Sequence, residues 1–218
     1  IIQNNKWILL PISLFPTAPG QGAIGIEVKK DRKNLIKLLG EVNCKKTYEN
    51  VLQEKKIMAR YGGGCQQKIG LSIWERHGKK IISMCGKTDN KTTLNQFSIL
   101  EQIKKTNKKN KRQNIYPIKG IDKNIFDRKV IDNSRKIKGI KDSLIYLSRK
   151  NVIKKADNIH PSNIIWTSGV KCWKSMVKKG IWVNGTSEGL GESEPLNIDN
   201  LLPSDTNYFK LSHSKASS

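Results

Sequence analysis

Histidine and cysteine are scarce in this chain of 218 residues. It contains three histidines and four cysteines, and no two cysteines are close enough to form a C-x-x-C pair. A zinc site built on sequence spacing is therefore not indicated. A disulfide framework is typical of shorter secreted chains that are denser in cysteine. We therefore expect no metal centre and a reducing, cytoplasmic location.

Long apolar runs are also missing. The opening stretch IIQNNKWILLPISLF contains Lys6 and Pro11 and has no basic segment before its apolar part. It predicts neither a signal peptide nor a membrane span, so we expect no membrane among the partners. The chain begins with Ile1 rather than Met, which leads us to expect a processed chain or a fragment. Its length predicts one or two domains.

Acidic residues are few, because 18 of them face 41 lysines and arginines, for a net charge of +23. Such an excess favours anionic partners, either nucleic acid, a membrane surface or polycarboxylate ligands. Compositional drift is the alternative, since Lys, Asn and Ile are all abundant. The run KKTNKKNKR at 104–112 is typical of a solvated linker. It lacks the aromatic residues that single-strand binding prefers, so a basic nucleic-acid-binding protein is the less favoured function.

The first hundred residues contain patterns of both helices and strands. Alternation in 23–28 predicts a strand, and leucines at helical spacing predict a helix over 32–43. Thr47 is a candidate cap for a second helix over 48–61. Lys55 falls in the middle of the apolar face expected for that helix, which is formed by Tyr48, Val51, Leu52, Met58 and Ala59. Its side chain is then either a snorkelling stem or a cation aimed into a cleft.

Three glycines at 62–64 follow this helix and lead directly to Cys65. Glycine after the last periodic residue usually ends a helix, and alternation in 68–75 and 80–86 then predicts a hairpin. Further on, 143–148, 163–168, 181–185 and the start of 208–218 resemble strands, with a helix over 169–180. We therefore predict an α+β protein: a small sheet with helices on one face, followed by a partial α/β domain.

Two quoted segments carry a family resemblance. FPTAPGQGAIGIEV (15–28) and LQEKKIMARYGGGCQQKIGLSI (52–73) resemble hydroxymethylbilane synthase, also called porphobilinogen deaminase. The resemblance covers about residues 1–100. It implies that 1–28 end the second domain of the deaminase, that 29–100 form its C-terminal cofactor-bearing domain, and that 101–135 are a basic linker. The substrates implied are porphobilinogen and linear polypyrroles.

The same resemblance assigns Cys65 as the attachment point of a covalent dipyrromethane cofactor. A thiolate suits this role because it is the nucleophilic form of cysteine. Gln21, Gly22, Lys55 and Gly64 border the cofactor, although Lys55 stands where the family has arginine and Lys68 where it has proline. The family's catalytic aspartate precedes Ile1. We therefore expect no catalytic residue in this chain, an inactive isolated chain, and a need for the missing N-terminal domains in cis or in trans.

Residues 164–194 resemble part of uroporphyrinogen-III synthase, the next enzyme of the pathway, which is sometimes fused to the deaminase. The resemblance implies that 136–218 are a partial α/β region of that enzyme, and it assigns no catalytic residue. Thr167, Ser168 and Thr186 are candidate hydroxyls, but hydroxyls at strand ends are more often caps. A truncated product without activity is the remaining alternative.

Overall fold

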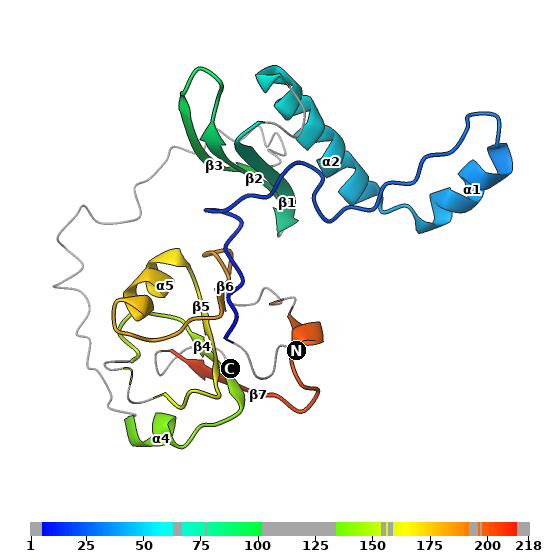
Figure 1. Ribbon diagram of the computed structural model, residues 1–218. Helices are drawn as coiled ribbons and strands as arrows, with labels where there is room; N and C mark the ends of the chain where they lie inside the picture. Colours follow the sequence, from blue (N-terminus) through cyan, green and yellow to red (C-terminus); the bar gives the residue numbers. More distant parts are fainter. Residues whose placement is uncertain are drawn as a thin grey trace, which may run out of the picture. The chain divides into compact units, whose positions relative to one another are not determined.

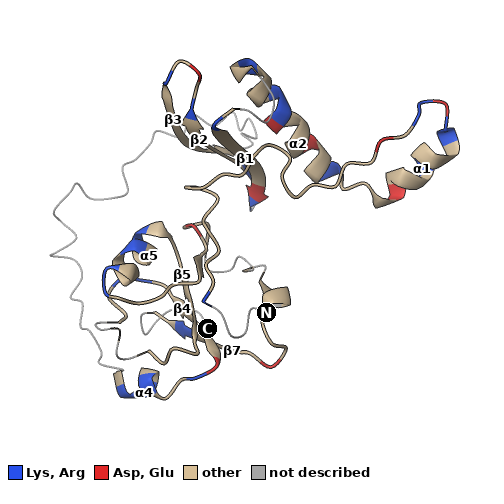
Figure 2. Cartoon of the chain, in the orientation of Figure 1, with Lys and Arg blue, Asp and Glu red and all other residues tan. Residues whose placement is uncertain are grey.

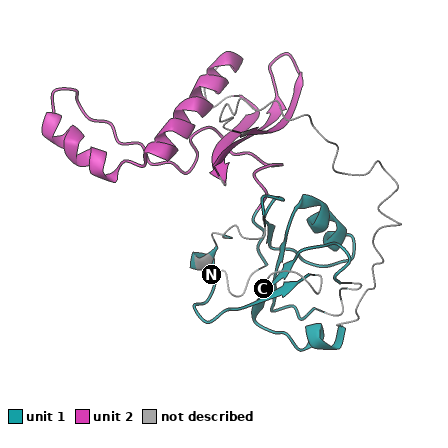
Figure 3. Cartoon of the chain, turned by 180° about the vertical axis from the view of Figure 1, so that it is seen from behind, with its two compact units in different colours: residues 1–9, 104–218 teal, residues 10–103 magenta. Residues whose placement is uncertain are grey.

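The computed structural model describes residues 6–62, 67–76, 78–101, 134–153, 156, 159–191, 196 and 198–212 (Figure 1). The chain divides into two compact units (Figure 3). Unit 2 is Leu10–Ile103, and unit 1 combines Ile1–Leu9 with Lys104–Ser218. Unit 2 contains an antiparallel sheet and unit 1 a parallel one, so the predicted α+β class is confirmed.

The sheet of unit 2 has the order β1-β2-β3. β1 (Ile69–Arg76) and β2 (Lys79–Lys87) form the predicted hairpin, with Ile73 opposite Ile82. β3 (Thr93–Glu101) pairs antiparallel with β2. β3 was not predicted from the sequence, because alternation of its apolar residues is limited to Phe97 and Ile99. Both side chains are more than 40% exposed, as is that of Leu100.

Helix α2 (Lys45–Met58) covers one face of this sheet. Met58 packs with Ile69, Leu71 and Met84 in the core of unit 2. The helix begins three residues earlier than predicted, with Cys44 at its N-cap, so the expectation of a Thr47 cap was wrong.

The predicted apolar face of α2 is correct for Met58, which is buried, but wrong for Tyr48 and Leu52, which are 55% and 49% exposed. Glu54 and Met58 are the buried residues of the helix, and Lys55 is exposed. The helix is rotated so that the Glu54 carboxylate points inward, where backbone N–H groups bind it.

Helix α1 (Lys33–Val42) forms where the leucine spacing predicted it, but it has no buried residue. The strand expected at 23–28 is wrong, since these residues are irregular and Ile24 is 93% exposed. A strand needs a hydrogen-bonded neighbour, and the described part of the chain provides none for this segment. After α2, η1 (Ala59–Tyr61) ends at Gly62, which has a φ of 95°, as the glycine signal predicted.

Unit 1 has a parallel sheet of order β6-β5-β4-β7 (Figure 1). β4 (Ser143–Leu147) is buried at every position. Ile145 and Leu147 face a cluster that includes Cys172 and Met176 of α5 (Val170–Val177), while Leu144 and Tyr146 face a second cluster. Both faces of the sheet are therefore covered, as in most parallel sheets.

The other elements of unit 1 are β5 (Ile164–Thr167), β6 (Gly185–Thr186), β7 (Asn207–Leu211), α4 (Ser134–Lys138) and η3 (Asp199–Leu201). The strands predicted over 143–148, 163–168 and the start of 208–218 are confirmed. The strand expected over 181–185 was wrong over 181–184, which are irregular, because β6 begins only at Gly185. The side-chain oxygen of Asn184 accepts the Ile165 N–H at 2.9 Å, so a side chain replaces a ladder bond just before β6.

Candidate functional site

A buried carboxylate joins three segments of unit 2. Glu54 is 7% exposed. One of its oxygens accepts the backbone N–H of Gly20 at 2.7 Å and the other accepts that of Ile73 at 2.7 Å. Hydrogen bonds to a charged acceptor are stronger than neutral ones. Glu54 therefore fixes the glycine turn at 20–22 to the middle of α2 and to β1.

The residues before this turn run along β1. The Leu71 N–H donates to the Thr17 carbonyl at 2.8 Å, and the Thr17 N–H donates to the Ser72 hydroxyl at 2.9 Å. The two hydroxyls lie 3.1 Å apart. A side chain at Gly70 would run into the Pro16 carbonyl, so this approach requires glycine. The sequence analysis missed Thr17 and Ser72; the hydroxyl of Ser72 within an apolar strand was the only signal.

Gln21 and Gly22, both predicted at the cofactor, lie on this turn. The Gln21 N–H donates to Ala18 and the Ala23 N–H to Gly20, each at 3.1 Å. Gly20 and Gly22 have φ angles of 73° and 82°, a region that glycine adopts without steric penalty. The Gln21 side chain is exposed. The turn thus presents a side-chain amide on a backbone that Glu54 holds in place.

Lys55, the third predicted site residue, follows Glu54 on α2 and is exposed. The position expected for it, in the middle of the buried face, was wrong. Within the described residues it forms no ion pair, whereas Lys46 binds Glu75 at 2.9 Å. Lys68 is also exposed. Figure 2 shows basic residues on the helices of both units.

Gly64 and Cys65 lie outside the described residues. The chain on either side of them is placed, because Gly62 ends η1 and the Gln67 side-chain amide donates to Asp89 at 3.2 Å. Their assignment to the cofactor stays a prediction. The described residues do fix α2 and β1 to each other through Glu54.

The other cysteines occupy three different environments. Cys44 is exposed, at the N-cap of α2. The hydrogen bond from the Thr47 hydroxyl lowers the pKa of its thiol below the ordinary value. Cys85 lies half-buried on β2, where its thiol is 3.8 Å from the Asn95 side-chain oxygen. Cys172 is in the core of unit 1, where burial raises the pKa of its thiol.

The candidate hydroxyls of unit 1 bind backbone groups at strand ends. Thr167 donates to the Gly185 carbonyl at 3.4 Å and Ser168 to the Ser148 carbonyl at 2.8 Å. The Thr186 hydroxyl accepts the Glu188 N–H at 3.2 Å. These contacts support the interpretation as caps.

Two classes of feature are not found in the described part of the chain. No group of three or more His, Cys, Asp or Glu side chains is arranged to hold a metal ion there. None of the helices described has the length and apolar character needed to cross a membrane.

Curated proteins similar to this chain are porphobilinogen deaminases. The deaminase of Lawsonia intracellularis is 43% identical over 60 residues, or 28% of this chain and 19% of the relative. That of Prochlorococcus marinus subsp. pastoris is 30% identical over 92 residues, which are 42% of this chain and 29% of the relative. That of Bacillus cereus strain AH820 is 32% identical over 86 residues, which are 38% of this chain and 28% of the relative. The chain thus spans less than a third of the length of these relatives. No family model and no solved structure matches it.

Proposed function

We propose that this chain is part of a porphobilinogen deaminase, a transferase of tetrapyrrole biosynthesis that polymerises four porphobilinogen units. The similarity to deaminases of three bacteria carries the proposal. It is supported by the fixed arrangement of the glycine turn at 20–22, α2 and β1 around Glu54. In this proposal 1–28 end the second domain, 29–100 are the cofactor-bearing domain and 101–135 a linker.

Cys65 is the proposed attachment point of a dipyrromethane cofactor. The thiolate form of its side chain acts as the nucleophile in attachment, and the bound cofactor supplies the end to which pyrrole units are added. The residues proposed to border the cofactor fit a ligand rich in carboxylates. Gln21 presents an amide donor, Lys55 an ammonium group without an ion pair among the described residues, and the space beside Gly22 is open.

The remaining parts of a deaminase are needed for turnover in this proposal, whether in the same chain or in a second one. Two observations support this. The chain spans less than a third of the length of its relatives. In addition, α1 buries none of its residues, and Ile24 and Ile26 are 93% and 62% exposed. Exposed apolar patches often mark surfaces that another polypeptide covers.

For 136–218 we propose a region like uroporphyrinogen-III synthase, fused to the deaminase part. The parallel pair β4 and β5, followed by α5, is consistent with an α/β domain. We assign no catalytic residue there. We place the protein in the cytoplasm, in keeping with the free thiols of Cys44, Cys85 and Cys172.

Porphobilinogen consumption tests the proposal. The purified chain alone should not consume porphobilinogen. Consumption should begin when the parts of the Lawsonia deaminase that the chain does not match are supplied, either fused or as a second polypeptide. Cys65→Ser should abolish it and Cys85→Ser should retain it. Turnover by the chain alone would contradict the need for further domains, and turnover that survives Cys65→Ser would contradict the role of that thiol.

A further inference from the structure

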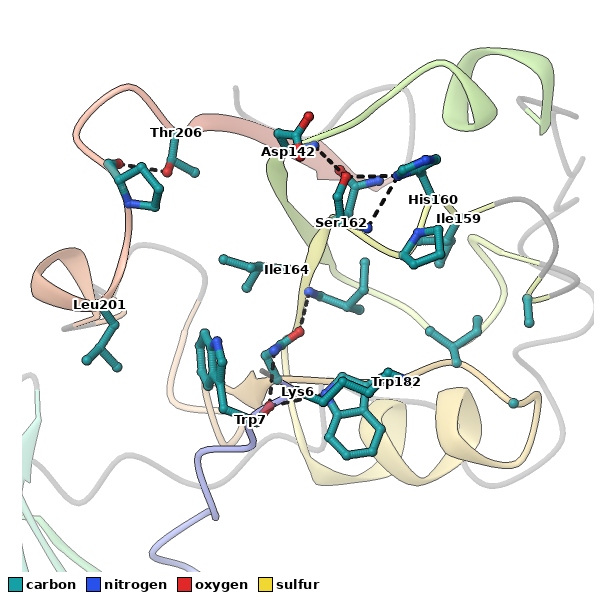
Figure 4. A pocket seen from close by; sticks show the side chains of 18 residues that line it. Lys6, Trp7, Asp142, Ile159, His160, Ser162, Ile164, Trp182, Leu201 and Thr206 are labelled. Carbon is teal, nitrogen blue, oxygen red and sulfur yellow. Dashed lines mark hydrogen bonds between the residues drawn. The ribbon is translucent and has the colours of Figure 1, made fainter. Parts of the chain in front are cut away.

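Unit 1 contains a cavity of about 670 Å³ at the amino ends of its parallel strands. Asp142 precedes β4, Ser162 precedes β5, Trp182 precedes β6 and Thr206 precedes β7, and all four line it (Figure 4). The volume falls within the range of small-molecule sites, about 300–1,000 Å³. The cavity lies at the strand edge opposite to Thr167, Ser168 and Thr186, so it is separate from the candidate hydroxyls.

The middle of the cavity is apolar. Ile164, Ile165 and Ile181 line it, and the indoles of Trp7 and Trp182 border it on one side. The Trp182 N–H donates to the Trp7 carbonyl at 3.1 Å, and the Asn184 side-chain amide donates to the same carbonyl at 3.1 Å. These bonds hold both indole-bearing segments in place. Aromatic side chains with restrained positions favour flat apolar ligands.

The two ends of the cavity carry different polar groups. Lys6, Trp7 and Trp182 lie at one end, and Asp142, His160 and Ser162 at the other (Figure 4). The Lys6 ammonium is 5.5 Å from the centre of the Trp182 ring. Lys6 is exposed, so the cation remains accessible at that end.

Hydrogen bonds to Nδ1 select the tautomer of the His160 imidazole at the second end. The Ser162 N–H donates to His160 Nδ1 at 3.3 Å, and the Ser162 hydroxyl lies 2.8 Å from the same atom. The Asp142 N–H in turn donates to that hydroxyl at 2.9 Å. Because Nδ1 accepts, neutral His160 carries its proton on Nε2. This end therefore combines a ring N–H donor with the Asp142 carboxylate, which would repel an anion.

We infer that this cavity binds a planar aromatic acid, with its carboxylate at Lys6 and a hydroxyl or amine at Asp142 and His160. The ring lies on the isoleucines between the two ends. A cation at one end and a carboxylate at the other select this orientation, because the reverse places like charges together. The inference does not depend on the proposed deaminase function.

This inference is tested by measuring the fluorescence anisotropy of 6-hydroxy-2-naphthoate in the presence of the full chain. The probe should bind saturably, and 2-naphthol and 2-naphthoate should compete more weakly. Lys6→Met should weaken the binding of 6-hydroxy-2-naphthoate and of 2-naphthoate about fivefold, which is the effect of losing one partly exposed charge pair. The affinity for 2-naphthol should be unchanged. Asp142→Gly removes the carboxylate and tolerates the φ of 47° at that position. It should weaken the two hydroxyl-bearing probes and leave 2-naphthoate unchanged or tighter.

Lys174→Met is the matched control for charge, since Lys174 is exposed on α5 and does not line the cavity. It should leave all three affinities unchanged at constant ionic strength, and thermal melting should show that every variant is folded. Absence of saturable binding would overturn the inference. Equal weakening by Lys6→Met and Lys174→Met would also overturn it, because it would show that anions bind through the net charge of the chain.

Discussion

The two units of the chain differ in how completely they cover their apolar surfaces. In unit 1, β4 is buried at all five positions and both faces of the sheet lie against apolar clusters. In unit 2, one face of the sheet packs on α2, while Phe97 and Ile99 of β3 are 44% and 46% exposed. α1 buries no residue at all.

The difference shows that a similar supply of apolar residues does not produce the same core. Unit 1 closes its core with its own segments, including Trp7, which packs against Leu144 and Trp166. Unit 2 has a smaller apolar cluster around Met58, Leu71 and Met84. Polar contacts of Glu54, Thr17 and Ser72 join its segments beside that cluster. We therefore expect apolar substitutions to affect unit 1 most and polar ones to affect unit 2 most.

The largest expected effect is that of Leu147→Ala, since this side chain is 0% exposed in the core of unit 1. Removing it should lower the free energy of unfolding of unit 1 by about 3 kcal/mol, from lost burial and the cavity left behind. Leu100→Ala in β3, where the side chain is 46% exposed, should change stability by less than about 1 kcal/mol. Urea unfolding measures both, and equal losses would break the comparison.

Glu54→Gln should have the next largest effect. The amide keeps one acceptor but turns its NH₂ group toward one of the two backbone N–H groups. The free energy of unfolding of unit 2 should therefore fall by about 2 kcal/mol. Amide hydrogen exchange should become faster at Gly20 and Ile73, the two donors. Glu49→Gln on the exposed side of the same helix should leave both rates unchanged. Unchanged exchange in Glu54→Gln would refute the role of this carboxylate.

A smaller effect, about 1 kcal/mol, is expected for Gly22→Ala. The space around Gly22 is open, but its φ of 82° disfavours a side chain. Gly25→Ala is the matched control, because Gly25 also has open space around it and has no positive φ. Thermal melting of the two variants compares them, and an equal melting temperature would show that the turn at 20–22 adapts without strain.

The smallest effect on stability is expected for Leu38→Gln on α1, where the side chain is 60% exposed. Stability of the isolated chain should change by less than about 0.5 kcal/mol. Binding to the supplied remainder of a deaminase should nevertheless weaken severalfold, as measured by calorimetry. Lys37→Gln, at the neighbouring exposed position, should leave that binding unchanged. If the two variants bind the remainder of the deaminase equally well, α1 is not part of the surface that this remainder covers.

Prediction from sequence was successful where elements are local. The hairpin at 68–86 follows from alternation and α1 from helical spacing, and β4, β5 and β7 were recognised as short strand-like segments. Prediction failed where contacts with residues distant in the sequence determine how a segment is oriented or paired. Glu54 rotates α2 through bonds to residues 34 and 19 positions away, which helical periodicity does not encode. The segment 23–28 has a strand pattern, but its described surroundings hold no partner strand.

The functional residues divide in the same way. Gln21 and Lys55 were predicted from the family motif; both are exposed, and along the chain they follow Gly20 and Glu54, which bind each other. The contribution of Thr17 and Ser72 became visible only in three dimensions, because 55 residues separate them. The cavity of unit 1 was not foreseen either, since its lining comes from loops before four strands and from the segment around Trp7.

Intact-mass analysis tests the central claim, that Cys65 bears the cofactor, most directly. The chain is assembled with the remaining parts of a deaminase, incubated with porphobilinogen and dissociated before measurement. The account predicts an added mass of two porphobilinogen units less two molecules of ammonia. This adduct should be retained in Cys44→Ser, Cys85→Ser and Cys172→Ser and lost in Cys65→Ser alone. An adduct that persists in Cys65→Ser would contradict the account.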